Sequence, residues 1–112
     1  MAITVRGTDP QDLLSRIKQA IDEKGIENWS YDADGDFTHS VAQWENSAWL
    51  RPSVSSNTLI LHIIGPKDIG VNRAVYAVYH GRFVEMLLRR FDEHFKTVEV
   101  SALASAGDNV KG

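Results

Sequence analysis

Three aspartates alternate along one short segment of this chain. Asp32, Asp34 and Asp36 occupy every second position, and Phe37 follows directly. Alternating acids open the calcium loop of an EF-hand, in which their carboxylate oxygens bind the ion. That loop also requires a glycine at its sixth position and a glutamate at its twelfth, whereas counting from Asp32 gives Phe37 and Gln43. The segment therefore favours an Asp-Gly turn between two short strands over a calcium site.

Such a turn would fix how its two flanking strands pair. Trp29 and Tyr31 would lie on the first strand, Phe37 and His39 on the second, and Gly35 between them can adopt a positive φ. As the tip of a hairpin, the acidic segment has one remaining candidate function, which is to present a compact negative loop to a basic partner.

Four histidines are the other side chains suited to catalysis or metal binding. Their spacing matches neither HExxH nor another metal-ligand motif. On a folded sheet, however, His39, His62 and His80 could converge with Asp36 or Glu85 in a zinc or acid–base site. This gives an alternative function, a small metal-dependent or acid–base enzyme. Without a spacing signal we favour partly buried, hydrogen-bonded histidines, and we expect no catalytic residue, metal or cofactor.

Arginines recur along a predicted C-terminal helix. Arg82, Arg89 and Arg90 lie near one another, and Arg73 precedes them. Guanidinium groups bind phosphate, so nucleic-acid binding is a weaker alternative function. Glu85 and two later acids stand three or four residues from these arginines and favour a face that pairs with itself. The net charge of the chain is −3, whereas phosphate neutralisation needs clustered bases, so nucleic acid is a disfavoured partner.

Tryptophan and arginine are residue types that anchor protein interfaces, and the chain has three tryptophans. Trp44 and Trp49 flank a predicted turn, and core and interface positions suit them equally. Trp29 is predicted to belong to the core. The candidate binding residues are Trp44, Trp49, Arg51, Tyr76, His80 and Arg82.

The elements that must position these residues follow from the apolar periodicity. Alternation over residues 3–6 predicts a short edge strand. Apolar residues at three- and four-residue spacing predict a helix over residues 10–24. Asp9 should cap the start of that helix, and Gly25 should end it in the left-handed conformation.

Further strands are predicted over residues 29–31, 37–43, 48–54 and 58–64, with a last short strand at 98–100. Residues 58–64 are apolar on both faces, which predicts a central strand covered on both sides or at a subunit interface. An apolar face over residues 71–96 predicts a long second helix. Gly81 in its middle costs about 1 kcal/mol relative to alanine, so we expect another backbone or an aromatic ring to approach it.

Together these elements predict the α+β class. We expect an antiparallel meander sheet of four or five strands with two helices, in the order βα-βββ(β)-α, and with the long C-terminal helix packed on the sheet. The length of 112 residues fits one domain, predicted over residues 1–104, followed by a flexible tail at 105–112.

Composition narrows the class of function. The chain has no cysteine, which excludes disulfides and thiolate chemistry and fits a reducing cytoplasm. There is no signal pattern at its start, and its longest apolar run, residues 59–64, is too short to span a membrane. With no catalytic motif and much apolar surface, we expect a small cytoplasmic binding protein that acts by protein–protein contact, without catalysis, as a homodimer. Adaptors, chaperones, inhibitors and immunity proteins are of this type.

Overall fold

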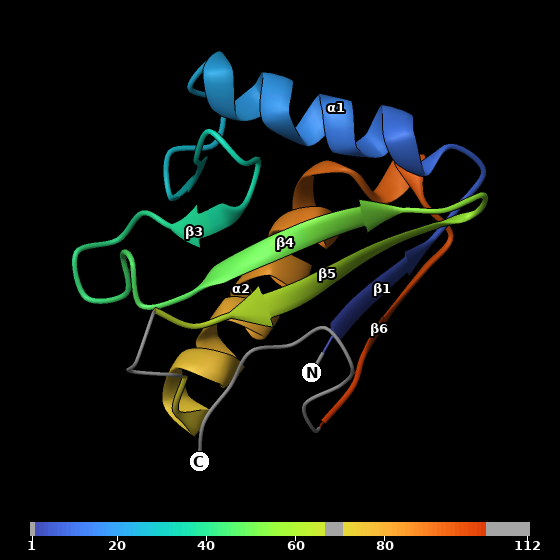
Figure 1. The fold of residues 1–112 in the computed structure, drawn as a ribbon. Helices are drawn as coiled ribbons and strands as arrows, with labels where there is room; N and C mark the ends of the chain where they lie inside the picture. Colours follow the sequence, from blue (N-terminus) through green and yellow to red (C-terminus); the bar gives the residue numbers. More distant parts are fainter. Residues whose placement is uncertain (1, 67–70, 103–112) are drawn as a thin grey trace.

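The computed structural model describes residues 2–66 and 71–102, which form a helical layer on a sheet (Figure 1). In chain order the elements are β1 (Ala2–Arg6), α1 (Pro10–Asp22), β2 (Trp29–Tyr31), β3 (Phe37–His39), β4 (Trp49–Val54), β5 (Thr58–Ile64), α2 (Arg73–Arg90), the 3-10 helix η1 (Asp92–His94) and β6 (Thr97–Val100). The predicted α+β class is confirmed. The predicted tail at 105–112 lies outside the described residues.

All six strands join one antiparallel sheet in the order β2-β3-β4-β5-β1-β6. Strands β2 to β5 form the predicted meander, and the last short strand expected at 98–100 is present as β6 beside β1. The sheet exceeds the predicted four or five strands because β1 and β6 both join it. β1 is therefore interior: Ile3 pairs with Leu61 of β5 on one side and with Val100 of β6 on the other. The prediction of an edge strand is wrong, since alternation identifies a strand but not its neighbours.

Both helices cover the same face of the sheet. Leu59, Leu61 and Ile63 of β5 are fully buried, whereas the residues between them are only partly buried. The buried face joins one hydrophobic core with Leu13, Leu14 and Ile17 of α1 and with Tyr79, Phe83 and Leu87 of α2. In Figure 1, α2 lies behind β4 and β5. β5 is central as predicted, but within residues 2–66 and 71–102 helices cover only one of its faces.

The first helix begins as predicted and ends two residues early, at Asp22. The side chain of Asp9 accepts a hydrogen bond of 3.0 Å from the backbone N–H of Asp12, and Pro10 occupies the first turn. At the other end Lys24, not Gly25, takes the left-handed conformation, with φ of 61°. The N–H groups of Lys24 and Gly25 then bond to carbonyls of the last helical turn, which is a Schellman motif. The helix ends where these bonds close.

The second helix is shorter than predicted. It spans 18 residues, about 27 Å at 1.5 Å per residue, and ends at Arg90 rather than near residue 96. Phe91 leaves the helical conformation with φ of −131° and is 7% exposed. After η1, Phe95 packs against the core as well. The apolar spacing continues to Phe95, but these rings reach the core from a tighter turn and not from a continued helix.

Gly81 on this helix has no close neighbour among residues 2–66 and 71–102. A Cβ atom built on it would meet nothing within 4 Å beyond the adjacent helical backbone, and the residue is exposed. The expected approach of a backbone or an aromatic ring is therefore wrong. No helix in the described part of the chain is long and apolar enough to cross a membrane.

β3 is also shorter than predicted, ending at His39 and not near residue 43. The carbonyl oxygen of Val41 accepts hydrogen bonds from the N–H groups of Trp44 and Glu45. These residues therefore form a turn, and β4 and β5 follow it within one residue of their predicted positions.

Candidate functional site

The acidic segment is the tip of the β2–β3 hairpin, as predicted. Trp29 pairs with His39 and Tyr31 with Phe37. Gly35 takes the left-handed region with φ of 84°, which few other residues adopt without strain. The tip therefore sets the register that brings Trp29 beside His39.

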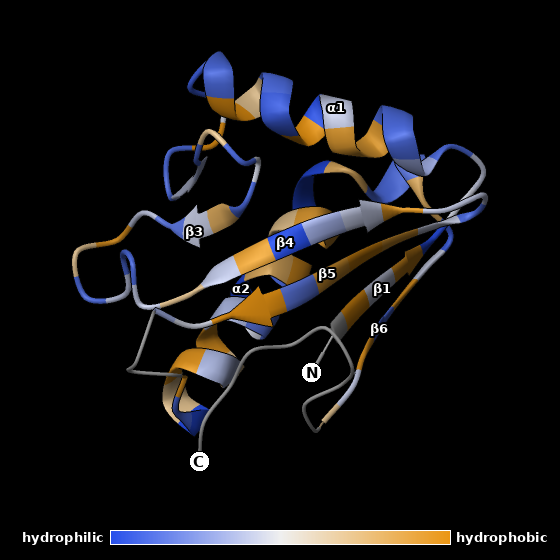
Figure 2. Cartoon of the chain, viewed as in Figure 1, coloured by the Kyte–Doolittle hydropathy of each residue, from blue (hydrophilic) through white to orange (hydrophobic). Residues whose placement is uncertain are grey.

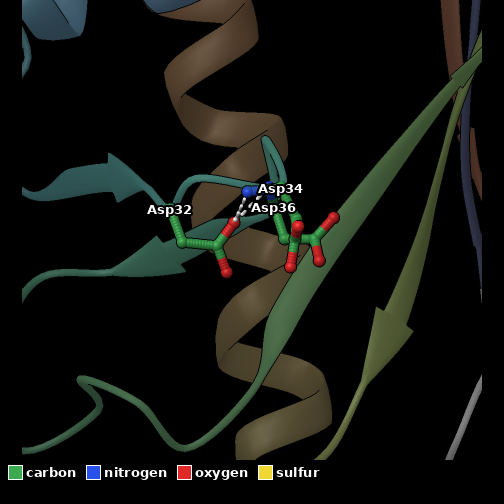
Figure 3. A group of neighbouring side chains, drawn as sticks. All are labelled: Asp32, Asp34 and Asp36. Atoms are coloured by element: carbon green, nitrogen blue, oxygen red, sulfur yellow. Dashed lines mark hydrogen bonds between the residues drawn. The ribbon is translucent and has the colours of Figure 1, made fainter.

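Asp32 organises the backbone of this tip. Its Oδ1 atom accepts the backbone N–H groups of Asp34 and Asp36, each at 3.0 Å (Figure 3). One carboxylate oxygen from each aspartate lies within 4.8 Å of the others. Within residues 2–66 and 71–102, no other group of three acidic or histidine side chains is close enough to share a metal ion.

Arg51 of β4 supplies the positive charge for this acidic cluster. Its Nε and Nη2 atoms donate to the two carboxylate oxygens of Asp36 at 3.1 and 2.8 Å, and only 6% of the Asp36 side chain is exposed. This hydrogen bonding and the charge of Asp36 raise the pKa of Arg51, and Asp34 and Asp32 raise it further. A cation of the chain therefore pairs with the buried carboxylate of Asp36, while Asp32 and Asp34 keep the hairpin end negative. No observation beyond the carboxylates themselves points to a metal.

His39 is completely buried between the hairpin and α2. Its Nδ1 atom lies 2.7 Å from the carbonyl oxygen of Asn28, and its Nε2 atom lies 3.2 Å from Nη1 of Arg82. A guanidinium group only donates hydrogen bonds, so Nε2 is the acceptor and Nδ1 carries the hydrogen. The imidazole is therefore neutral. Its ring stacks on Trp29 with centroids 4.7 Å apart, and Tyr79 contacts it edge-on.

The surroundings of His39 hold it in this neutral form. Burial is the largest effect and lowers its pKa below the ordinary 6.5, and the positive charge of Arg82 lowers that pKa further. The hydrogen bond to the carbonyl of Asn28 opposes both effects and raises the pKa. His39 can therefore serve as an uncharged anchor for Arg82.

The structure does not bring the three candidate histidines together. His39 lies on the helix-covered face, whereas His62 pairs with Arg51 on the opposite face of the sheet. His80 is 2% exposed, and its Nδ1 atom lies 2.7 Å from the carbonyl oxygen of Tyr76 one turn earlier. The three side chains form no shared metal group among the described residues.

The other candidate binding residues divide between core and surface. Burial raises the pKa of Tyr76, which is 8% exposed and stacks near His80 with ring centroids 5.0 Å apart. Trp44 packs against the core, and its carbonyl accepts a hydrogen bond from the hydroxyl of Tyr79. Trp49 pairs with Ile64 on the face away from the helices. The sequence favoured neither a core nor an interface position for Trp44 and Trp49. In the structure Trp44 packs against the core, whereas Trp49 lies away from it.

One face of the sheet carries the partly exposed residues of its central strands, and we call it the open face. Across β4, β5, β1 and β6 the residues on it are Trp49, Arg51, Ser53, Thr58, Ile60, His62, Ile64, Thr4, Arg6, Thr97 and Glu99. Figure 2 shows β5 hydrophobic along most of its length with one hydrophilic band, and both kinds of residue along β4. On this face Ile60 and Ile64 flank His62 along β5, with Ile64 at the end of the strand opposite Trp49, and Arg6 and Glu99 form an ion pair of 3.3 Å.

A second surface feature lies on the helical side, between α2 and the connection from α1 to β2. A cavity of about 340 Å³ is lined by Asn28, Arg82, Glu85, Met86, Arg89 and Arg90. A neighbouring hollow shares Asn28 and Arg90 and extends to Lys24 and Glu27. We call the two together the arginine groove. Within residues 2–66 and 71–102, no ion pair involves Arg82, Arg89 or Arg90, so the expected self-paired face is wrong.

Sequence reasoning identified the arginines of this groove but not its other wall. Arg82 and Arg89 are seven residues apart, which is about two helical turns and therefore the same side of the helix. Arg73 lies about 180° around the helix from Arg82 and does not line the groove. Nothing in the sequence marked Lys24 or Asn28, because their contact with α2 arises only from the path of the chain after α1.

Comparison with known proteins adds no relative to these findings. No known protein family matches the sequence, and no curated protein or solved structure is significantly similar to it. The class of the protein therefore rests on its own fold and surfaces. It is an α+β protein with one helix-covered face, one open sheet face and a groove lined by arginines that form no ion pair among the described residues.

Proposed function

We propose that this chain is a non-catalytic binding protein that acts by protein–protein contact and pairs with a second copy of itself through the open face. The alternation of β5 carries the proposal. Inward residues of this strand are fully buried, while Ile60 and Ile64 on the other side remain partly exposed. Apolar residues that cluster on a surface are typical of interaction sites. The absence of cysteine supports a cytoplasmic setting.

The layout of the open face suits a symmetric dimer. Ile60 would supply one apolar contact and the pair of Trp49 and Ile64 a second, with Arg51 and His62 between them. Interfaces between proteins combine apolar contacts with charged and hydrogen-bonding groups. A two-fold axis through this face would bring the same residues of both copies together, as a self-complementary interface requires.

The size of the face is compatible with a weak interface. The strands β1, β4, β5 and β6 have 5, 6, 7 and 4 residues. At about 3.4 Å per residue and about 4.8 Å between strands, they cover roughly 360 Å² per copy in projection. Two copies would thus cover on the order of 700 Å² together, which is the size of a weak contact.

Sedimentation equilibrium of the parent and of two matched variants tests the proposal. Ile60→Lys places a charge in the centre of the open face, and Leu88→Lys makes the same change at a 51% exposed leucine on α2. We expect the parent to be a dimer at about 100 µM, Ile60→Lys to weaken the dimer at least about tenfold, and Leu88→Lys to leave it unchanged.

A monomeric parent under these conditions would contradict the proposal. So would an equal loss of dimer in both variants, because the contact would then depend on hydrophobicity in general and not on this face. Circular dichroism on each variant establishes that the fold is retained.

A further inference from the structure

The arginine groove lies on the helical side of the molecule, so its use is independent of the open face. Its residues come from the last half of α2 and from the connection after α1. Three arginines line the main cavity with a single acid, Glu85. In a chain whose net charge is −3, this concentration of unpaired positive charge is a local exception.

Arg82 is positioned by a neutral hydrogen-bond partner that does not neutralise its charge. Surface arginines are commonly neutralised by a carboxylate, as Arg16 is by Asp12 at 2.6 Å on α1. Arg82 instead donates one N–H group to the neutral, fully buried His39. A guanidinium group has five N–H donors, so four remain for a ligand. An ordered and still cationic guanidinium loses little entropy when it binds a carboxylate or phosphate bidentately.

The spacing of the arginines sets the length of a ligand. The Cα atoms of Arg82 and Arg89 are about 10.5 Å apart along the helix, and Arg90 adds a second cation at the distal end. The cavity of about 340 Å³ falls within the range of small-ligand sites. A small molecule with an anionic group at each end would reach both positions.

Two features oppose a nucleic acid in this groove. Glu85 stands between Arg82 and Arg89, and Glu27 lines the neighbouring hollow. These carboxylates would repel a continuous chain of phosphates, but either can accept a hydrogen bond from a hydroxyl or amino group of a small ligand. Because the C-terminal end of a helix carries partial negative charge, the arginines alone must supply the attraction for an anion.

We propose that the arginine groove binds a small ligand with two oxyanion groups, carboxylate or phosphate, one held by Arg82 and the other by Arg89 and Arg90. His39 acts as a positioning residue for Arg82, and Glu85 accepts a hydrogen bond from a donor group between the two anions. The site requires neither the second copy nor the open face.

The test is a titration monitored by the arginine Nε–Hε signals in ¹H–¹⁵N NMR spectra of the full chain. Pyrophosphate represents linked phosphates, citrate represents carboxylates, and inorganic phosphate represents a single group. We expect pyrophosphate or citrate to shift the signals of Arg82 and Arg89 with saturation, and to bind at least about tenfold more tightly than inorganic phosphate. The stronger of the two probes distinguishes phosphate from carboxylate ligands.

Matched charge variants separate a site from general attraction. Arg82→Gln and Arg89→Gln should each weaken binding about tenfold, whereas Arg73→Gln on the far side of the same helix should leave it unchanged. Equal effects of all three variants, or no saturable shift with either probe, would overturn the proposal. Tighter binding of a thymidine oligonucleotide than of both small probes would also overturn it. Sedimentation of the same samples keeps this result separate from the dimer, whose failure leaves the groove intact.

Discussion

His39 is a neutral base enclosed by aromatic rings and a guanidinium group, and this makes the fold sensitive to acid. Burial holds its pKa below 6.5 in the folded protein, whereas the unfolded chain has the ordinary value. Below pH 6.5 the unfolded state therefore takes up a proton that the folded state does not. We expect the free energy of unfolding to decrease as the pH falls from 6.5 to the folded pKa of His39, measured by urea titration at several pH values.

Two variants assign this pH dependence to one side chain. His39→Gln should remove the part that arises from the imidazole, and His94→Gln on η1 should keep it. A free energy of unfolding that increases on acidification in this range would contradict a buried neutral His39.

Arg51 contributes to stability through the nearly buried Asp36. In Arg51→Ala, Asp36 loses both of its charge-assisted hydrogen bonds while it remains shielded from water. We expect the free energy of unfolding to decrease by about 1–3 kcal/mol. Arg16→Ala is the control, because its ion pair with Asp12 is exposed and should change stability by less than about 0.5 kcal/mol. Urea denaturation measures both, and equal losses would show that burial of Asp36 is unimportant.

The same ion pair predicts that calcium has no effect on folding. Arg51 occupies both carboxylate oxygens of Asp36, and Oδ1 of Asp32 accepts two backbone N–H groups. We therefore expect the same melting temperature with calcium and with a chelator, both for the parent and for Asp34→Asn combined with Asp36→Asn. A calcium-induced rise in the parent alone would reverse the assignment of the tip as a hairpin end.

Residue chemistry was predictable where it depended on neighbours in sequence. The missing glycine and glutamate identified the hairpin tip, and the turn gave the pairing of Trp29 with His39. The contact of His39 with Arg82 spans 43 positions and joins a strand to a helix. No sequence pattern encodes such a contact, because it depends on how α2 lies across the sheet.

Among the elements, α2 carries a glycine that nothing in the described structure requires. Gly81 is exposed, and a Cβ atom there meets no other group within 4 Å. Alanine restricts the unfolded chain more than glycine and suits the helix better, so Gly81→Ala should raise the free energy of unfolding by about 1 kcal/mol. Thermal and urea denaturation monitored by circular dichroism provide the measurement.

The same substitution in the hairpin tip should have the opposite sign. Gly35 has φ of 84°, and a Cβ atom there would lie 3.0 Å from Nζ of Lys18. Gly35→Ala should therefore lower stability by about 1 kcal/mol or more. Equal changes in stability for Gly35→Ala and Gly81→Ala would show that backbone conformation does not determine the effect of alanine.

The sequence located the elements better than their ends and neighbours. The apolar patterns placed both helices and β5, because burial of one face requires a fixed period. The end of α2 depended on Phe91 reaching the core, and the left-handed residue after α1 was Lys24 and not the adjacent glycine. These outcomes follow from tertiary contacts and hydrogen bonds that local propensity does not contain.

For the molecule as a whole, association through the open face would couple stability to concentration. Folded copies that pair are favoured by mass action, so the melting temperature of the parent should rise over a concentration range of about a hundredfold. Ile60→Lys should melt at a temperature that is independent of concentration. Differential scanning calorimetry provides the comparison, and a parent without concentration dependence would argue against the dimer.

The interior position of β1 determines the order in which the sheet can close. Its Ile3 pairs with Leu61 and with Val100, residues far along the chain. The chain must close a long loop before either pairing can form, and the entropy cost of that closure slows folding. During synthesis β1 is made before both of its partners. It cannot pair until β5 has left the ribosome, and it keeps one open edge until β6 follows. Throughout that interval Ile3 and Val5 are exposed to other chains, so the nascent protein is the form most exposed to aggregation.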